Sequence, residues 1–205
     1  MLDAPHGVLR AVAWSPDGAQ LLITAFYDHD GHLEQAEDGA LVRTIPLGGE
    51  GAGVAFSPDG RWAAVGTEDG PITLVDRVHG GPDRVLSEPR RPSESLAFVG
   101  GVLAAGGHEG VLWLWDATSG ALTRRLDVGA PIVRLATVSG RPVLALASRD
   151  QPLRLYDVAR GALLDTLTWH RAAVTALAWS GQVLLSGDAD GALALWDLNE
   201  RLAAP

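Results

Sequence analysis

The stretch VTALAWSGQVLLSGDADGALALWD at residues 174–197 decides the fold of this chain. Apolar and polar or small residues alternate over residues 174–179, and a second short apolar run covers residues 183–187. Alternation with a period of two is typical of a β-strand with one buried face. Asp190-Gly191 is a hairpin signal, because glycine adopts positive φ without strain, and a third strand follows at residues 192–196.

The same plan returns along the whole chain at intervals of about 40 residues. The first strand and its turn recur as AWSPDG at 13–18, AFSPDG at 55–60, AFVGG at 97–101 and ATVSG at 136–140. In the first two copies proline presets φ at the second turn position and glycine suits the last. Four short strands in each unit of about 40 residues are typical of a propeller blade, whose faces are buried only by stacking on its neighbours. We therefore predict an all-β chain, a β-propeller of about five four-stranded antiparallel blades.

The repeats divide the chain into five units within one domain of residues 1–205. Their expected bounds are residues 9–48, 49–90, 91–130, 131–170 and 171–205. Five blades could close into a tight ring, remain an open arc, form part of a longer propeller or pair with another chain. Met1-Leu2-Asp3 could supply the missing fourth strand of the last blade, because Arg201 to Pro205 make a poor strand. The polar stretch FYDHDGHLEQAEDG at 26–39 predicts a short or frayed third strand in the first unit.

Composition excludes several classes of function. The net charge is −9 and the pI about 5.0, so the electrostatic field repels nucleic-acid phosphates. All 16 basic residues are arginine, which indicates a GC-rich bacterial coding sequence and excludes a Schiff-base lysine. Cysteine is absent, and no apolar run is long enough to cross a bilayer. We expect a cytoplasmic protein that binds neither nucleic acid nor membranes.

The dipeptides Trp115-Asp116 and Trp196-Asp197 resemble the signature of the WD-repeat family, and the resemblance covers nearly the whole chain. In that family a histidine, a serine or threonine, an aspartate and the tryptophan form a hydrogen-bonded network inside a blade. The resemblance assigns this structural network to His170, Ser186, Asp190 and Trp196. The other units lack one or more of these residue types, so a complete network is expected in one blade only. Four tryptophans occupy strand positions shared between units and are expected in the core: Trp14, Trp115, Trp179 and Trp196.

Two segments and one histidine could suggest other chemistry. Residues 28–32, DHDGH, hold metal-ligand types but do not match a calcium loop, so we interpret them as a solvated hairpin tip. The glycine-rich residues 48–53 are interpreted as a connection between units, because no helix follows to cap a phosphate. The repeat position of His170 assigns it to the network rather than to general-base catalysis. We predict no catalytic residue, no metal ligand and no cofactor.

The resemblance implies a protein or peptide partner that binds on the loop rim of the propeller, where loops rest on a rigid scaffold. Arg10 and Glu94 also lie in the rim loops, and five residues are predicted to contact a partner: Glu68, His108, Arg149, Trp169 and Arg171. We therefore predict a non-catalytic interaction scaffold. The alternatives are a regulatory or sensor segment of a larger signalling protein that carries a kinase or ATPase, and, less favoured, a propeller hydrolase. The strands expected to line the centre are apolar, which argues against the hydrolase.

Overall fold

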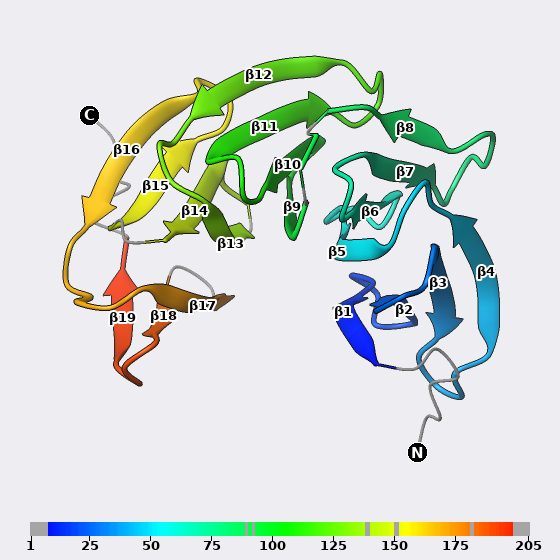
Figure 1. The fold of residues 1–205 in the computed structure, drawn as a ribbon, viewed down its shortest axis with the longest axis horizontal. Helices are drawn as coiled ribbons and strands as arrows, with labels where there is room; N and C mark the ends of the chain where they lie inside the picture. The colour runs from blue at the N-terminus through cyan, green and yellow to red at the C-terminus, as the bar shows by residue number, and fades with distance from the viewer. Residues whose placement is uncertain are drawn as a thin grey trace.

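The computed structural model describes residues 8–88, 90–91, 93–137, 140–149, 152–180 and 183–198. These residues contain 19 β-strands and no helix, which confirms the all-β class. Consecutive strands pair in antiparallel order into four sheets of four strands and one sheet of three described strands. We call the sheets blades 1 to 5 in chain order (Figure 1).

Each blade lies within the bounds of one predicted unit. Blade 1 contains β1 (Leu9–Trp14), β2 (Gln20–Ala25), β3 (Asp30–Gln35) and β4 (Leu41–Pro46). Blade 2 contains β5 (Gly51–Phe56), β6 (Trp62–Thr67), β7 (Ile72–Asp76) and β8 (Arg84–Leu86). Blade 3 contains β9 (Ser95–Val99), β10 (Val102–Gly106), β11 (Val111–Asp116) and β12 (Leu122–Asp127). Blade 4 contains β13 (Ile132–Thr137), β14 (Val143–Ser148), β15 (Leu153–Asp157) and β16 (Ala162–Leu167). Blade 5 contains β17 (Val174–Ser180), β18 (Val183–Asp188) and β19 (Leu193–Asp197).

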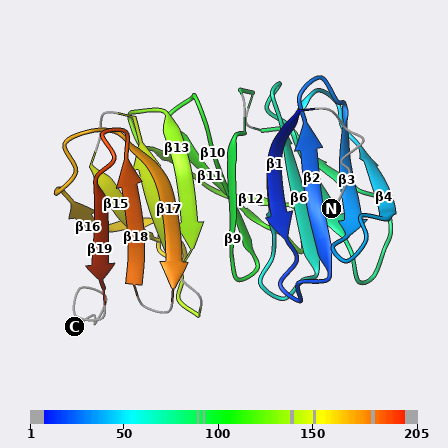
Figure 2. The same cartoon turned by 90° about the horizontal axis from the view of Figure 1, so that it is seen from below.

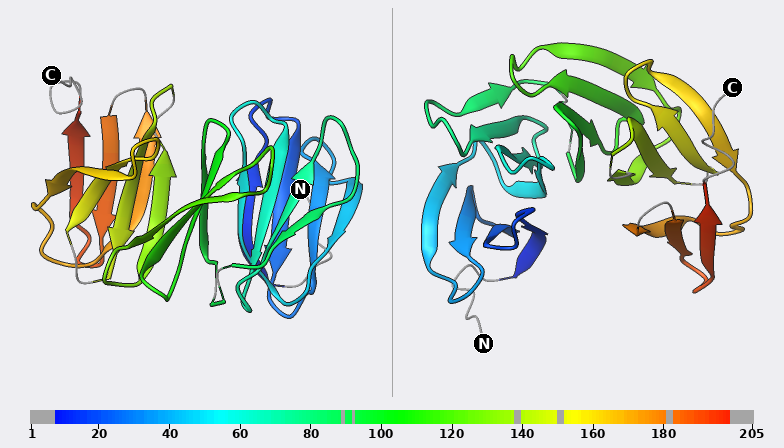
Figure 3. Two further views of the ribbon diagram at one scale, coloured as in Figure 1. Left: turned by 90° about the horizontal axis from the view of Figure 1, so that it is seen from above. Right: turned by 180° about the vertical axis from the view of Figure 1, so that it is seen from behind.

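The blades stand around a common axis as an open arc, with blades 1 and 5 at its two ends (Figure 1). The first strand of each blade faces the axis, and these inner strands contact one another in sequence, from β1 through β5, β9 and β13 to β17. The last strands, such as β4 and β12, lie on the outer edge (Figure 3). Of the arrangements left open by the sequence, the described residues therefore adopt the open arc. The proposed closing strand at residues 1–3 and the end at 201–205 lie outside the described residues.

The hydrophobic core consists of four layers between neighbouring blades. Each buried cluster draws its side chains from two consecutive blades, so blades 1 and 2, 2 and 3, 3 and 4, and 4 and 5 share one cluster each. Between blades 2 and 3, for example, Ile72 and Leu74 of β7 join Phe98 of β9. Burial of apolar area between blades is the main force that holds the arc together.

The predicted turn after the first strand forms in blade 1 and again in blade 2. The Gly18 amide donates to the Ser15 carbonyl over 2.9 Å, and Gly18 has a φ of 70°, which favours glycine. The Ser15 hydroxyl donates to the Asp17 carboxylate, and this bond holds the pKa of Asp17 below its usual value. Ser57 and Asp59 repeat the arrangement.

Arginines on the outer strands of blades 1, 2 and 3 each connect their blade to the next, a feature that we did not predict from the sequence. Arg43 of β4 makes two hydrogen bonds of 2.8 and 2.7 Å to the Asp83 carboxylate. Arg84 of β8 donates to the Thr118 carbonyl, and Arg124 of β12 donates to the Ala159 carbonyl over 2.9 Å. These arginines recur at about the repeat period, which is the signal that could have revealed them.

The prediction of a frayed third strand in blade 1 was wrong. Residues 30–35 form the complete strand β3, paired with β2 on one side and β4 on the other. Its polar side chains His32 and Glu34 are buried, with 7% and 5% exposed. His32 Nε2 lies 2.8 Å from Asp28 Oδ2, so a polar partner stabilises the buried imidazole. Residues 28–32 are therefore not a wholly solvated hairpin tip.

The expectation that Trp14 belongs to the core was also wrong. Its side chain is 61% exposed on blade 1, whereas the equivalent Phe98 of blade 3 is 3% exposed. The reason is position in the arc, because this face of β1 looks away from blade 2 and no described blade stands on that side. The other three predicted core tryptophans pack in the layers between blades.

Candidate interaction rim

Loops gather at the end of the blades where each first strand begins, the upper edge in Figure 2. We call this end the loop rim. It contains the connections between consecutive blades and the turns between the second and third strand of each blade. Strand packing fixes where these loops begin and end but does not constrain their side chains. The loop rim can therefore carry residues that the stability of the blades does not require.

A buried hydrogen-bond network supports the rim at blade 5. His170, just before β17, places Nε2 2.6 Å from the Ser186 hydroxyl on β18. The same hydroxyl accepts a hydrogen bond of 2.7 Å from the Trp196 indole on β19. His170 Nδ1 lies 2.8 Å from Asp188 Oδ2, and the two side chains are 4% and 3% exposed. The network therefore ties a rim loop to two strands through groups that water does not reach.

The carboxylate of this network is Asp188 and not Asp190, which corrects the sequence assignment. Side chains alternate along a strand, so Asp188 lies on the same face of β18 as Ser186. Asp190 lies beyond the strand in the exposed β18–β19 turn, where its amide donates to Asp188 over 3.1 Å. The positions equivalent to Asp188 in the other blades hold Ala25, Thr67, Gly107 and Ser148.

Proton positions in the network follow from its partners. A carboxylate only accepts, so His170 Nδ1 carries the proton toward Asp188, and Nε2 of a neutral ring accepts from the Ser186 hydroxyl. The hydrogen bond from His170 is the main reason that the pKa of Asp188 lies below its usual value. Every polar atom in the chain from Trp196 to Asp188 thus has a partner, and the arrangement is structural.

A series of ion pairs crosses blades 1 to 3 on the loop rim. The Arg10 guanidinium pairs with Glu68 and lies 3.7 Å from Glu94, whose other oxygen lies 3.3 Å from His108 Nε2. Arg10 also lies over the Phe26 ring, 5.0 Å from its centre. The carboxylate side chains are 35% exposed and His108 is 54% exposed, so water screens these pairs and each adds little stability. Their main effect is to hold the charges in defined positions.

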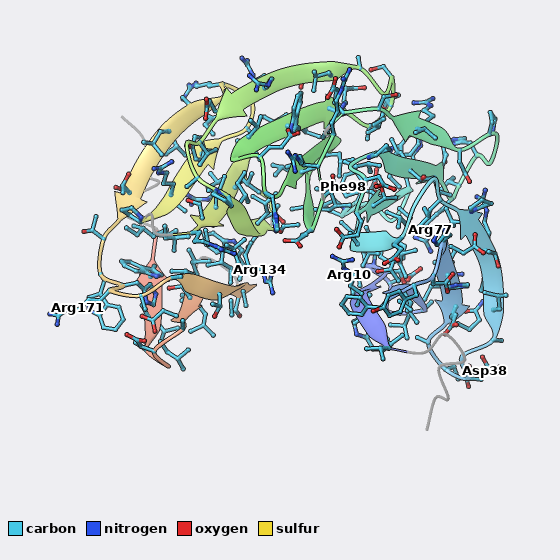
Figure 4. All side chains as sticks on the ribbon, in the orientation of Figure 1. Arg10, Asp38, Arg77, Phe98, Arg134 and Arg171 are labelled. Carbon is cyan, nitrogen blue, oxygen red and sulfur yellow. The ribbon has the colours of Figure 1, made fainter. Side chains whose placement is uncertain are left out.

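Arg134 faces this series from the other side of the arc. Figure 4 shows Arg10 and Arg134 projecting toward the central opening from blades 1 and 4. They line a hollow of about 200 Å³ together with Ala11, Ala52 and Glu94. Arg134 Nη1 donates only to the carbonyl of its neighbour Val133 in the part of the chain that the structure describes, so it is available to an anionic group.

The structure brings together some of the predicted contact residues and separates others. Glu68 and His108 belong to one ion-pair series, through Arg10 and Glu94. Trp169 and Arg171 lie in the loop before β17 on blade 5, and Figure 4 shows Arg171 at the outer side of the arc. Trp169 is 57% exposed, and its ring meets that of the network residue His170 edge-on at 5.2 Å. Arg149 is exposed after β14 on blade 4.

Comparison with known proteins agrees with the blade plan. The family model "WD domain, G-beta repeat" matches residues 49–70 and 161–197. A solved structure of U3-55K superposes with a TM-score of 0.84 at 20% identity, covering 98% of this chain and 64% of that chain. The matched segments are WD repeats, and the chain as a whole has the fold of a WD-repeat β-propeller. The second matched segment contains the whole network of blade 5.

Curated WD-repeat relatives are much longer than this chain. The U3 small nucleolar RNA-associated protein 21 homolog of Schizosaccharomyces pombe is 25% identical over 82% of this chain and 18% of its own length. The WD repeat-containing protein ATCSA-1 of Arabidopsis thaliana is 30% identical over 48% of this chain and 23% of its own length. This chain thus spans less than a quarter of either relative.

The WD-repeat family is generally non-catalytic. Among the described residues, no group of three or more histidine, aspartate or glutamate side chains is placed to hold a metal ion. The described part of the chain also lacks any helix that could span a bilayer. A second hollow, of about 510 Å³, lies near the opposite end of blades 2 to 4, where Phe98, Val99 and Pro142 give it mainly apolar walls.

Proposed function

We propose that this WD-repeat protein is a non-catalytic scaffold that binds a protein or peptide partner on the loop rim. The observation that carries the proposal is Trp169, which is 57% exposed beside the rigid network of blade 5. An exposed tryptophan on a rigid support is the type of residue that dominates binding energy at protein interfaces. Arg171 beside it adds a charge that the packing of the blade does not require.

The charges near the axis favour a partner that also carries charge. Glu68, Glu94 and His108 lie on the same rim as Trp169, and Arg134 offers a cation across the opening. Charges held in position steer association and select partners more than they add affinity. A net charge of −9 disfavours direct contact with RNA, so the proposal remains a protein or peptide partner in the cytoplasm, as expected from the sequence.

A second candidate is a regulatory or sensor segment of a larger signalling protein. The observation that favours it is the length of the relatives, because the match covers only 18% and 23% of the two curated proteins. In that role the same rim would contact another part of the larger protein. The rim variants described next would then weaken that contact as well.

Quantitative pull-down from an extract of the source organism tests the proposal. The double variant Trp169→Ala, Arg171→Ala should lose the proteins that the wild type retains. Leu163→Ala is the matched control, because Leu163 is 51% exposed on the outer strand β16. Urea denaturation of each variant verifies that the fold is intact. Equal capture by all three proteins, or no specific capture by any, would contradict binding at Trp169.

A further inference from the structure

The rim of blades 4 and 5 carries arginines that no described carboxylate neutralises. Arg149 follows β14 and Arg171 precedes β17, and both side chains are exposed. Within the described ranges, neither side chain makes a hydrogen bond or an ion pair. Arg134 of β13 is also exposed, and in the same ranges its guanidinium donates to the Val133 carbonyl alone, over 2.7 Å. Asp190 is the single exposed carboxylate among the described loop residues of these two blades, and it forms no ion pair with any of the three.

The rim of blades 1 to 3 has an excess of the opposite charge. Its loops carry exposed or half-buried carboxylates at Glu50, Glu68, Asp69, Glu94 and Glu109. Two arginines of this half already lie beside a carboxylate, because Arg10 pairs with Glu68 and Arg90 lies 3.8 Å from Glu88. A charged segment that approaches the loop rim therefore meets repulsion on one half and attraction on the other.

Trp169 supplies an apolar surface within the basic half. Its side chain is 57% exposed, and its ring meets that of His170 edge-on at 5.2 Å. His170 belongs to the buried network of blade 5, so the tryptophan ring rests on a fixed support. Figure 4 shows Arg171 at the outer side of the arc and Arg134 toward the central opening, so the group crosses the width of a blade. Four strands about 4.8 Å apart span about 14 Å, which about five residues of extended peptide cover.

On the basis of the proposed binding at the loop rim, we propose that the partner presents a short, extended acidic segment to blades 4 and 5. An apolar side chain of the segment covers Trp169, and its aspartate or glutamate side chains pair with the arginines. Guanidinium groups suit this role because they bind a carboxylate through two parallel hydrogen bonds. The carboxylates of blades 1 to 3 repel the same segment and direct it to the other half of the rim. Charges more than about 8 Å away are largely screened at physiological salt, so the nearby arginines outweigh the net charge of −9.

Nucleic acid is the other polyanion that exposed arginines can bind. It carries a phosphate at every nucleotide, so a strand that crosses the rim would also bring charge against the carboxylates of blades 1 to 3. A peptide can confine its charges to the few residues that face the arginines. The divided charge of the rim therefore favours an acidic peptide over RNA.

Selection from a phage library of random peptides on the immobilised full chain tests the proposal. Labelled synthetic copies of the enriched peptides are then the probes, and fluorescence anisotropy measures their Kd. We expect enriched peptides to carry net negative charge and an apolar side chain. Arg149→Glu, Arg171→Glu and Trp169→Ala should each weaken their binding about tenfold or more, because a rim charge or anchor is lost.

Arg160→Glu is the matched control and should bind as the wild type does. It changes the net charge by the same amount, and Arg160 is 77% exposed in the turn after β15, at the opposite end of blade 4. A peptide whose acidic residues are replaced by lysine should bind Arg171→Glu more tightly than the wild type. Urea denaturation verifies that each variant is folded.

The proposal is overturned if the enriched peptides are neutral or basic, or if the rim variants bind them as well as Arg160→Glu does. It is also overturned if labelled oligo-uridine binds the wild type and loses binding in the same variants, because the arginines would then serve phosphates. Neutral peptides that depend on Trp169 would leave binding at the rim intact and remove only the acidic partner. Failure to select any peptide that depends on Trp169 would contradict both.

Discussion

Ser186 holds the buried network of blade 5 together, because its hydroxyl is shared by the His170 ring and the Trp196 indole. Among the described residues, neither His170 Nε2 nor Trp196 Nε1 has another hydrogen-bond partner. Both nitrogens would therefore be buried without a partner if the hydroxyl were removed, and that loss costs more than one average hydrogen bond. The network also supports the loop that carries Trp169, so its integrity bears on the proposed partner site.

Ser186→Ala should destabilise the protein by about 1–3 kcal/mol, since two buried polar groups lose their partner. Ser87→Ala, at an exposed serine, is the control and should change the free energy of unfolding by less than about 0.5 kcal/mol. Urea denaturation followed by tryptophan fluorescence measures both. Equal stability of the two variants would show that the network contributes nothing.

Asp188 should make stability depend on pH. Hydrogen bonding by His170 lowers the pKa of Asp188 in the folded state. The ionised Asp188 therefore contributes its full stabilisation to the folded protein above the unfolded pKa of about 4. This stabilisation is lost as the pH falls through the lower pKa of the folded state. Asp17, Asp59, Asp76 and Asp116 shift in the same direction. Asp188→Asn should therefore be less stable than the wild type at pH 7 and lose less stability below about pH 4. Denaturation midpoints between pH 3 and pH 7 measure this, and parallel curves for the two proteins would refute it.

The network shows how far sequence reasoning reaches at a single site. His170, Ser186 and Trp196 follow from the family pattern, but Asp190 was chosen over Asp188 two residues away. Both aspartates flank the same turn, and both positions have the same parity along the chain. Only the end of β18 at Asp188 separates a side chain directed by the strand from one in the exposed turn. Strand ends are the least predictable part of a sequence assignment.

At the scale of strands, the position of a glycine decides whether a side chain can be tolerated. Gly106→Ala should destabilise the protein by about 1–3 kcal/mol, because the new methyl would overlap Ile132 of the next blade. Gly187→Ala should have a much smaller effect, because the nearest atom, 3.1 Å away, belongs to the flexible Leu193 side chain of its own blade. Thermal unfolding of the two variants compares them. A larger loss at Gly187 than at Gly106 would contradict the placement of the blades.

Most strands were predictable from the sequence, because the pattern of each strand recurs in several copies of the repeat. The serine-proline-aspartate-glycine turns and the hairpins appear as expected. Strand β3 was missed because His32 and Glu34 read as solvent-exposed on residue type alone. Its pairing with β2 and β4, and the contact of His32 with Asp28, are tertiary effects that outweigh local propensity.

At the scale of the molecule, stability comes from layers between blades, so each blade depends on its neighbours. The repeat in the sequence predicted five units but left the closure of the ring open, because closure depends on what stands beside the two end blades. The same uncertainty explains Trp14, which occupies a core position of the repeat and is exposed only because blade 1 is terminal in the arc.

Stacking of blades as the source of the core is the central claim, and one pair of substitutions at equivalent positions tests it most directly. Leu112→Ala should destabilise the protein by about 2–5 kcal/mol, because Leu112 is fully buried between blades 3 and 4. Leu193→Ala should change stability by less than about 0.5 kcal/mol, because this leucine is 69% exposed at the end of the arc. The measurement is the free energy of unfolding of both variants in urea at low protein concentration. A clear difference in this order is the predicted result, and equal losses at the two positions would contradict the account.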